Sequence, residues 1–221
     1  MFKGCHFPKT VILTAVRWYL RYKLSYRDIE ELIAERGVSV DHATINRWVV
    51  KFSPTLLRNA RRHKRPVGSS WRMDETYVRV RGQWKYLYRA VDRQGATVDF
   101  LLTAKRDTDA ALRFLRGAVE RNGLPEKVTI DRSGSNAAGI AAYNAEAAAS
   151  LEVRQCKYLN NIVEQDHRFV KQKMRASLGW KTFHTAQATI AGIELMHMIR
   201  KGQVRPRIDG TDAEQFFALA A

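Results

Sequence analysis

Residues 71–92 read WRMDETYVRVRGQWKYLYRAVD, and this stretch decides the class of fold. Its two halves are rich in Tyr, Val, Leu and Trp, and the turn Arg81-Gly82-Gln83 separates them. Runs of this composition around a glycine-containing turn predict a β-hairpin. The first strand also holds two adjacent acids, Asp74 and Glu75. Carboxylates are rarely buried without a partner, so these two need an explanation of their own.

Strands and helices alternate after the hairpin. A third strand is expected at 97–103, and apolar spacing then predicts a helix over 109–121. The later elements expected are a strand at 127–131, a helix at 140–149, a strand at 152–155, and helices at 161–174 and 182–201. Three strands in a meander, followed by helix, strand, helix, strand and helix, give the order of an RNase H-like fold. The sequence therefore predicts a mixed α/β domain whose five-stranded mixed sheet is flanked by helices.

The N-terminal residues have the apolar period of helices instead. The first helix is expected over 9–22, the second begins at Ser25 as its N-cap and stops at Gly37, and the third runs from Asp41 to Pro54. Two short helices joined by a glycine-containing turn, with a third before them, outline a helix-turn-helix unit. The side chains expected to reach base edges or phosphates are Arg27, His42, Thr44, Asn46, Arg47 and Lys51. A small helical bundle with a solvated polar face fits the same pattern.

The positive charge of the chain lies in two regions. The 221 residues carry a net charge of +16, divided as +9 over residues 1–70, +2 over 71–153, +8 over 154–207 and −3 over the rest. A polyanion is the simplest partner for such a surface, which favours DNA as the ligand of the N-terminal helices. The expected domains are a helix-turn-helix domain at 1–57, a basic linker at 58–70, an RNase H-like domain at 71–204 and a C-terminal tail at 205–221.

Cysteine usage and hydropathy indicate in which cellular compartment the protein is expected. Cys5 and Cys156 form no CxxC motif, so neither a disulfide framework nor a zinc site is indicated. No signal peptide is recognisable, and no apolar run approaches the roughly 20 residues that cross a bilayer. We therefore expect a cytoplasmic protein that has no membrane partner and no small-molecule substrate.

Three acids are candidates for one site. Asp131 ends the fourth strand, which neighbours the first strand in an RNase H-like sheet, and such sheets place their sites at the carboxyl ends of strands. Alternation puts Asp74 on one face of its strand and Glu75 on the other. Glu164 opens a helix in YLNNIVEQDHRFVKQKM and can bring a third carboxylate. Asp74, Asp131 and Glu164 could hold two Mg²⁺ ions, or Mn²⁺ in their place, and act on a phosphodiester.

Each of these acids also has a structural explanation when it is considered alone. Glu164 lies three residues after Asn161, which is the spacing of a capping box. Asp131 precedes Arg132-Ser133-Gly134 and could form a turn, and Asp74 could pair with one of many arginines. Their joint placement on two neighbouring strands and a helix favours a catalytic triad over three separate structural roles.

Several ordered segments resemble the IS6 family of bacterial insertion-sequence transposases. They are residues 73–92, the N-terminal FKGCHF, RWY and ERGVSVDHATINRWV, the segment KYLNNIVEQDH and the closing ATIAGIELMHMIRKGQ, which together run from Phe2 to Gly202. The resemblance implies a DDE transposase with an RNase H-like catalytic domain and the triad Asp74, Asp131 and Glu164. Lys171, seven residues after the glutamate, matches the basic residue that DDE enzymes commonly keep to contact DNA near the cut end.

The resemblance also implies partners and a reaction. It implies Mg²⁺-dependent strand cleavage and 3′-hydroxyl transfer, binding to terminal inverted repeats and target DNA, action as a homo-oligomer, replicative transposition, and a place in the bacterial cytoplasm at the nucleoid. Two departures stand out. Only 32 residues separate Asp131 from Glu164, slightly fewer than usual, and Arg132-Ser133 stands where the family often has Lys-Ala. Two other functions fit these residues: a catalytically impaired DNA-binding derivative, and an RNase H-like nuclease of different specificity.

Overall fold

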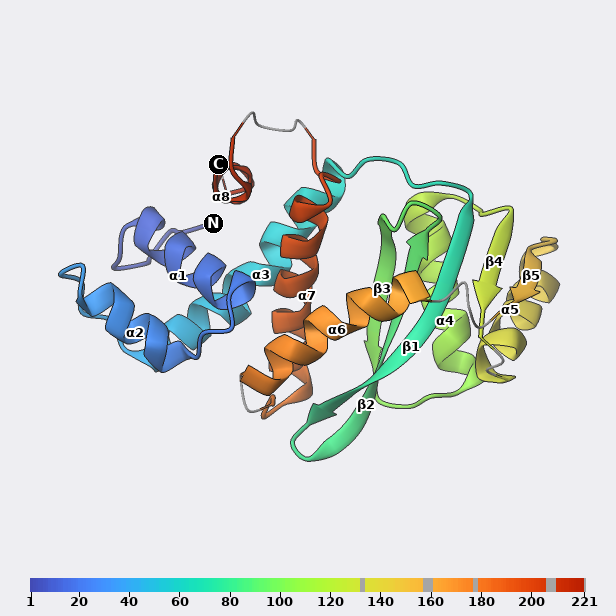
Figure 1. Ribbon diagram of the computed structural model, residues 1–221, viewed down its shortest axis with the longest axis horizontal. Coiled ribbons are helices and arrows are strands. Elements are labelled where there is room, and N and C mark those ends of the chain that lie inside the picture. Colours follow the sequence, from blue (N-terminus) through green and yellow to red (C-terminus); the bar gives the residue numbers. More distant parts are fainter. Residues whose placement is uncertain (132–133, 157–160, 177–178, 206–209, 221) are drawn as a thin grey trace. The chain divides into compact units, whose positions relative to one another are not determined.

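The hairpin predicted from residues 71–92 is present. The computed structural model describes residues 1–131, 134–156, 161–176, 179–205 and 210–220 (Figure 1). Strand β1 spans Ser70–Val80 and pairs antiparallel with β2, Gln83–Asp92. The chain forms two compact units, one of residues 66–171 and the other of residues 1–65 and 172–221. The departure noted at Arg132-Ser133 lies outside the described residues.

The unit of residues 66–171 contains one mixed five-stranded sheet. Its further strands are β3 (Thr97–Thr103), β4 (Lys127–Ile130) and β5 (Glu152–Gln155), and the order across the sheet is β3-β2-β1-β4-β5. The first three strands are antiparallel neighbours, whereas β4 is parallel to both β1 and β5. This order and these directions confirm the predicted RNase H-like arrangement.

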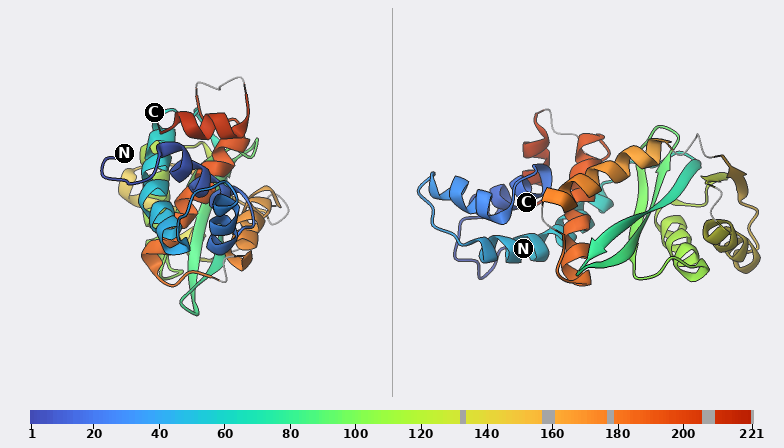
Figure 2. Two further views of the ribbon diagram at one scale, coloured as in Figure 1. Left: turned by 90° about the vertical axis from the view of Figure 1, so that its left-hand side faces the viewer. Right: turned by 60° about the horizontal axis from the view of Figure 1, so that its bottom comes forward.

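Helices cover both faces of this sheet (Figure 2). Helices α4 (Thr108–Asn122) and α5 (Gly134–Ala147) lie on one face, where Trp71 and Met73 of β1 join their apolar side chains in the core. The first part of helix α6 (Asn161–Ala176) lies on the other face, where it contacts side chains of β1 and β2. Because β-strand side chains alternate, Arg72 and Asp74 face α6, whereas Glu75 faces α4 and α5.

The hairpin is longer than the strand beside it. The last rung that β2 shares with β3 is Tyr86–Thr103, but the β1–β2 pairing continues outward to Val80–Gln83. Residues 77–86, called the ribbon tip below, therefore start at this last three-stranded rung and continue as a two-stranded ribbon over residues 78–85. Arg81 and Gly82 close the ribbon, and both have positive φ values.

The other unit is helical. Its helices are α1 (Lys9–Arg21), α2 (Tyr26–Ala34), α3 (His42–Arg62), α7 (Phe183–Arg200) and α8 (Asp212–Ala218). The two predicted N-caps are confirmed, because Ser25 forms a capping box with Asp28 and the Asp41 carboxylate accepts from the Thr44 amide. The second and third helices are therefore set locally by the residues that begin them.

The prediction that Pro54 ends the third helix is wrong, because α3 continues to Arg62. Proline removes one backbone hydrogen bond from a helix interior, which disfavours such a continuation. Here the apolar period also continues, and Phe52, Leu56 and Leu57 are almost fully buried on either side of the proline. Burial of this face offsets the lost bond. The segment expected as a linker at 58–70 therefore starts within a helix, and α8 occupies part of the expected tail.

The last part of α6 belongs to the helical unit. The ammonium group of Lys173 is buried, where it donates to the carbonyls of Tyr22 at 3.0 Å and Leu24 at 2.8 Å. It also lies 3.7 Å from the ring centre of Tyr19. Burial lowers the pKa of Lys173 to about 7. Lys173 thus binds the segment that connects α1 and α2. No helix in the described ranges is long and apolar enough to cross a membrane.

Candidate active site

Asp74 and Asp131 come from neighbouring parallel strands. The pairs between β1 and β4 are Ser70–Lys127, Trp71–Val128 and Arg72–Thr129. Continuing this register by two residues brings Asp131, the residue directly after β4, level with Asp74. The side chain of Asp74 is 16% exposed, so its carboxylate lies at the edge of solvent rather than in the core. The expected meeting of the two acids at this edge therefore follows from the strand order.

The pKa of Asp74 depends on the other two acids. Burial, together with repulsion from the carboxylates of Glu75, Asp131 and Glu164, raises the pKa of Asp74 to about 7. The three candidate carboxylates therefore share one electrostatic neighbourhood on the side of the sheet that α6 covers. A bound divalent cation would remove this repulsion, and oxygen ligands are those that Mg²⁺ prefers.

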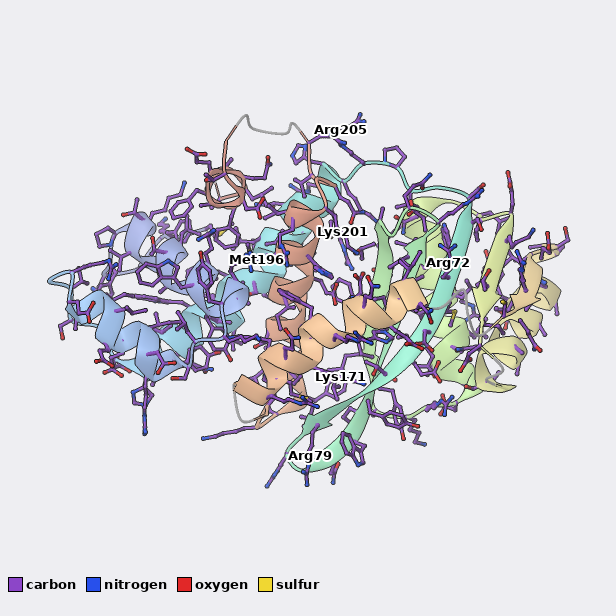
Figure 3. The ribbon with its side chains drawn as sticks, viewed as in Figure 1. Arg72, Arg79, Lys171, Met196, Lys201 and Arg205 are labelled. Carbon is purple, nitrogen blue, oxygen red and sulfur yellow. The ribbon has the colours of Figure 1, made fainter. Side chains whose placement is uncertain are left out.

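Glu164 and Lys171 lie on α6. Glu164 is exposed in the first turn of the helix, and Lys171 is half-buried two turns later (Figure 3). Seven residues of α-helix return to nearly the same face, so the two side chains lie along one side of α6. The carboxylates are not gathered into a finished metal centre. Among the residues that the structure describes, no three His, Cys, Asp or Glu side chains stand close enough to hold an ion.

A buried ion pair holds α6 on the sheet beside Asp74. Arg89 of β2 is opposite Asp74 in the strand register and is fully buried. Its guanidinium Nη1 lies 3.3 Å from the Asp166 carboxylate, two residues after Glu164. Burial lowers the pKa of Arg89 to about 10, which leaves the group charged at neutral pH. The pair therefore ties the first turns of α6 to the strand next to β1.

His167 supplies the second contact between α6 and β1. Its Nδ1 lies 3.5 Å from the Asp74 carboxylate oxygen, and the ring is nearly buried. Burial lowers the pKa of His167 well below its usual value, and the cations Arg89 and Lys171 lower it further. The imidazole is therefore neutral at pH 7, and its contact with Asp74 is not an ion pair.

Arg89 and Asp166 were not among the candidates that the sequence indicated. The available signal was the position of Arg89, which interrupts the apolar run LYRAV of β2. Asp166 follows Glu164 in NIVEQDH and carries no pattern of its own. Only their contact across the sheet shows that they belong together.

Glu75 lies on the opposite face, as alternation predicts, but it has a structural role there. Its side chain is 3% exposed and forms an ion pair with Arg106, whose Nη2 lies 2.5 Å from Oε1. The amide of Asn136 donates to the other carboxylate oxygen at 2.7 Å. Asn136 is in the first turn of α5, five residues after Asp131. Glu75 therefore joins β1 to the start of α5 and to the segment between β3 and α4.

We expect Glu75→Gln to lower stability while leaving the chemistry of the site in place. Gln keeps the volume but loses the charge that Arg106 requires, so the free energy of unfolding falls by about 1–3 kcal/mol. Strand transfer, measured well below the melting temperature, stays within about tenfold of wild type because Glu75 faces away from Asp131 and Glu164. Thermal denaturation and a strand-transfer assay check the two parts. An activity loss as large as that of Asp74→Asn would contradict the assignment.

The candidate DNA contacts of the helical unit differ in their exposure and in their contacts within the fold. Asn46 is half-buried and hydrogen-bonds with Tyr26 of α2, so its side chain is engaged within the fold. His42 contacts Glu30 of α2 through Nδ1 at 2.9 Å. His42 is exposed, as are Arg27, Arg47 and Lys51. Arg47 donates to Thr44 near the start of α3 at 2.5 Å. Arg47 and Lys51 are one turn apart and form a basic face of α3.

Comparisons with a family model and with known proteins agree on one family. The DDE_Tnp_IS240 family, described as a DDE domain, matches residues 68–203. That match extends beyond the compact unit ending at Lys171 and takes in α7. The transposase for insertion sequence-like element IS431mec of Staphylococcus aureus strain Mu50 is 38% identical over 205 residues, 90% of this chain and 88% of that protein. The Staphylococcus aureus transposase for IS257 in transposon Tn4003 has the same identity and coverage.

Two solved structures are also similar. The magnesium-bound catalytic core of HTLV-2 integrase, in its trimeric form, gives a TM-score of 0.48 at 13% identity and covers 66% of this chain and 100% of that one. The catalytic core of BIV integrase gives a TM-score of 0.46 at 16% identity and covers 69% of this chain and 95% of that one.

Proposed function

This chain belongs to the IS6 family of insertion-sequence transposases with a DDE domain, and from that premise we propose that it cuts and joins DNA with the triad Asp74, Asp131 and Glu164. The observation that carries the proposal is the strand register that brings Asp131 level with Asp74, beside the helix that carries Glu164. Asp74 lies within β1, Asp131 directly follows the adjacent parallel strand β4, and Glu164 lies in the first turn of α6. The chemistry proposed is strand cleavage at the ends of the element, followed by transfer of the freed 3′-hydroxyl into target DNA.

The triad would hold Mg²⁺, with two ions as the expected number. When bound, the ions supply the positive charge that activates the attacking oxygen and stabilises the leaving oxygen of a phosphodiester. Arg89 and Asp166 hold the first turns of α6 on the sheet beside Asp74, so that Glu164 would join the two aspartates. Neutral His167 lies against Asp74. Lys171 extends the basic side of α6 and would contact a DNA phosphate.

The pKa of Asp74 predicts how metal affinity depends on pH. A carboxylate must lose its proton to bind a cation, and Asp74 keeps its proton up to about pH 7. We therefore expect Mn²⁺ affinity to rise by about tenfold per pH unit below 7 and to level off above it. Calorimetry in buffers of different ionisation enthalpy, at pH 6 and pH 8, measures affinity and proton release together. Asp74→Asn is the control, since it has no proton to release; affinity independent of pH in the wild type would contradict the assignment.

The helical unit would recognise the terminal inverted repeats through α3. Arg47→Ala is expected to weaken binding to end DNA by about 1–3 kcal/mol if Arg47 reads a base, with the loss confined to that position of the repeat. Lys51→Ala is expected to weaken all sequences equally and to reduce the salt slope by about 1. Fluorescence anisotropy with repeat DNA and a shuffled duplex separates the two effects. Arg36→Ala, outside this face, is the control, and equal effects of all three variants would contradict the proposal.

A strand-transfer assay tests the function as a whole. Purified protein is given Mg²⁺, a supercoiled target and duplexes that end in the element's inverted repeats, with shuffled duplexes and an RNA–DNA hybrid as competing substrates. Joining that requires repeat ends supports the proposal. Cleavage of the hybrid without repeat ends would favour an RNase H-like nuclease, and repeat binding without cleavage would favour a catalytically impaired derivative.

The remaining proposals concern the oligomeric state and the cellular location of the protein. A reaction that joins two ends to one target needs more than one active site, so we expect a homo-oligomer on DNA, measurable by light scattering of the protein–DNA complex. The substrate places the protein in the bacterial cytoplasm at the nucleoid.

A further inference from the structure

The ribbon tip, residues 77–86, carries exposed aromatic side chains. Trp84 is 57% exposed and Tyr77 is 44% exposed. The strand register pairs Tyr77 with Tyr86 and Arg79 with Trp84, which places these four side chains on one face of the ribbon. The ring centres of Tyr77 and Trp84 are 6.1 Å apart and nearly perpendicular, and those of Tyr77 and Tyr86 are 5.3 Å apart. Tyr77 and Trp84 therefore form an exposed aromatic pair, whereas Tyr86 is partly buried and packs against the core of the sheet.

The same segment is basic and contains no acid. Between Glu75 and Asp92 the chain has no Asp or Glu, but the tip holds Arg79, Arg81 and Lys85. The Arg79 guanidinium lies 5.9 Å from the ring centre of Trp84. Arg79 lies near the end of the β1–β2 ribbon, where side chains project away from the strands (Figure 3). Aromatic rings interleaved with arginine and lysine suit a nucleic acid, because bases stack on the rings while the cations bind phosphates.

The turn that closes the ribbon carries an unexpected cation. Arg81 has φ of 48° and Gly82 has φ of 76°, so both central residues of this two-residue turn are left-handed. Asn or Asp precedes Gly in most such turns, because a left-handed backbone is unfavourable for other L residues. An arginine here gives up some stability and presents a positive charge at the outermost point of the ribbon. Strain of this kind is typical of functional positions.

We propose that the ribbon tip is a DNA contact in which Trp84 stacks on an unpaired base while Arg79, Arg81 and Lys85 neutralise phosphates around it. The inference rests on the proposed function and adds a second DNA contact to its active site. An unpaired base is specified because paired bases in a duplex are already stacked on their neighbours. A second copy of the chain is disfavoured as the occupant, since a two-fold interface would bring the same cations together.

The strand geometry predicts where the contact falls on the DNA. Arg79, which pairs with Trp84, is five residues from Asp74 along β1. At about 3.3 Å per residue the separation is about 16 Å, which corresponds to about five nucleotides of a B-form strand. Alternation puts Arg79 and Trp84 on the face opposite Asp74, so the path along the DNA is longer than the path along the strand. A photocrosslinking residue at position 84 should therefore react with DNA at least about five nucleotides from the cut phosphate.

The stacking part is tested with Trp84→Ala and Trp84→Phe in the full-length protein. The probe is a fluorescent duplex with a two-nucleotide single-stranded gap, and a fully paired duplex of the same sequence serves for comparison. We expect Trp84→Ala to weaken binding to the gapped duplex by about 5- to 100-fold, with a smaller effect on the paired duplex. Trp84→Phe should recover much of the loss. Leu124→Ala removes another exposed apolar side chain, 55% exposed, and should bind like wild type.

A substitution in the strained turn should change thermal stability and DNA affinity in opposite directions. Arg81→Asn should raise the melting temperature by about 2–4 °C, because Asn suits the left-handed position, while it weakens DNA binding and reduces the salt slope by about 1. Arg113→Asn, an exposed arginine on α4, should change neither quantity in this way. Gapped-duplex affinity unchanged in both Trp84→Ala and Arg81→Asn would overturn the proposal.

The outcomes separate this inference from the proposed function. If the tip has no DNA role, Trp84→Ala keeps wild-type strand transfer while Asp74→Asn does not. If the chain is not an active transposase, the wild type joins no DNA, yet the gapped-duplex measurements still decide the tip. A Trp84→Ala variant that loses self-association and keeps its affinity for DNA would overturn the proposal and identify an interface between copies.

Discussion

Asp74→Asn is expected to abolish strand transfer and at the same time to make the metal-free protein more stable above pH 7. The carboxylate is proposed as a metal ligand shared with Asp131 and Glu164, and its amide replacement cannot supply the negative charge. Loss of several kcal/mol of transition-state stabilisation corresponds to at least about 10³-fold in rate. The stability gain comes from the same charge, because burial disfavours the Asp74 carboxylate and the acids near it repel it.

The direction of the stability change follows from proton binding. The pKa of Asp74 is raised from 3.8 to about 7 on folding, so between these pH values the folded state holds a proton that the unfolded state has lost. Stability of the wild type therefore falls as pH rises from about 4 to 7, and the full penalty is present above 7. A shift of this size corresponds to about 4 kcal/mol as an upper limit, because the side chain keeps contact with solvent. Asp74→Asn lacks this penalty.

Two measurements check this expectation, with Glu75→Gln as the matched control. Thermal unfolding without metal, at pH 5 and pH 8, should show a pH-dependent loss in the wild type that is smaller in Asp74→Asn. Strand transfer with repeat-end DNA should be lost in Asp74→Asn but kept in Glu75→Gln, although the two acids are adjacent. Strand transfer by a folded Asp74→Asn protein would refute the proposed triad.

Arg89→Met should be among the most destabilising substitutions in the sheet domain. It leaves the Asp166 carboxylate buried beside β2 without its guanidinium partner at 3.3 Å. Removing one partner of a buried pair typically costs about 3–5 kcal/mol, whereas replacing both with apolar groups is often neutral. The double variant Arg89→Met/Asp166→Leu is therefore expected to recover most of the stability that the single variant loses.

The double variant also separates positioning from simple stability. If the ion pair sets where the first turns of α6 lie, an apolar pair will hold the helix less specifically and Glu164 will be displaced. We expect Mn²⁺ affinity to remain about 10- to 100-fold lower in the recovered double variant. Calorimetry at pH 8 and denaturant unfolding measure the two quantities. Wild-type Mn²⁺ affinity in the double variant would show that the pair acts on stability alone.

The sequence by itself determined the elements and much of the candidate site. Strand alternation assigned Asp74 and Glu75 to opposite faces, and the order of elements put the strands of Asp74 and Asp131 side by side. Ser25 and Asp41 marked the starts of two helices because capping is a contact between residues three apart. These features depend on local periodicity or on a short list of allowed topologies, and both can be read from one chain.

Only the tertiary structure decided the partners. Arg89 and Asp166 are 77 positions apart, and Glu75 meets Asn136 across 61, so no periodic pattern connects them. Pro54 favours a helix end, but burial of the apolar face of α3 outweighs this local preference. Helix α7 belongs to the helical unit although it follows the proposed catalytic residues in the sequence. The physical reason is the same in each case. A buried charge or an apolar face is stabilised by whatever the fold brings against it, and that neighbour is set by packing rather than by distance along the chain.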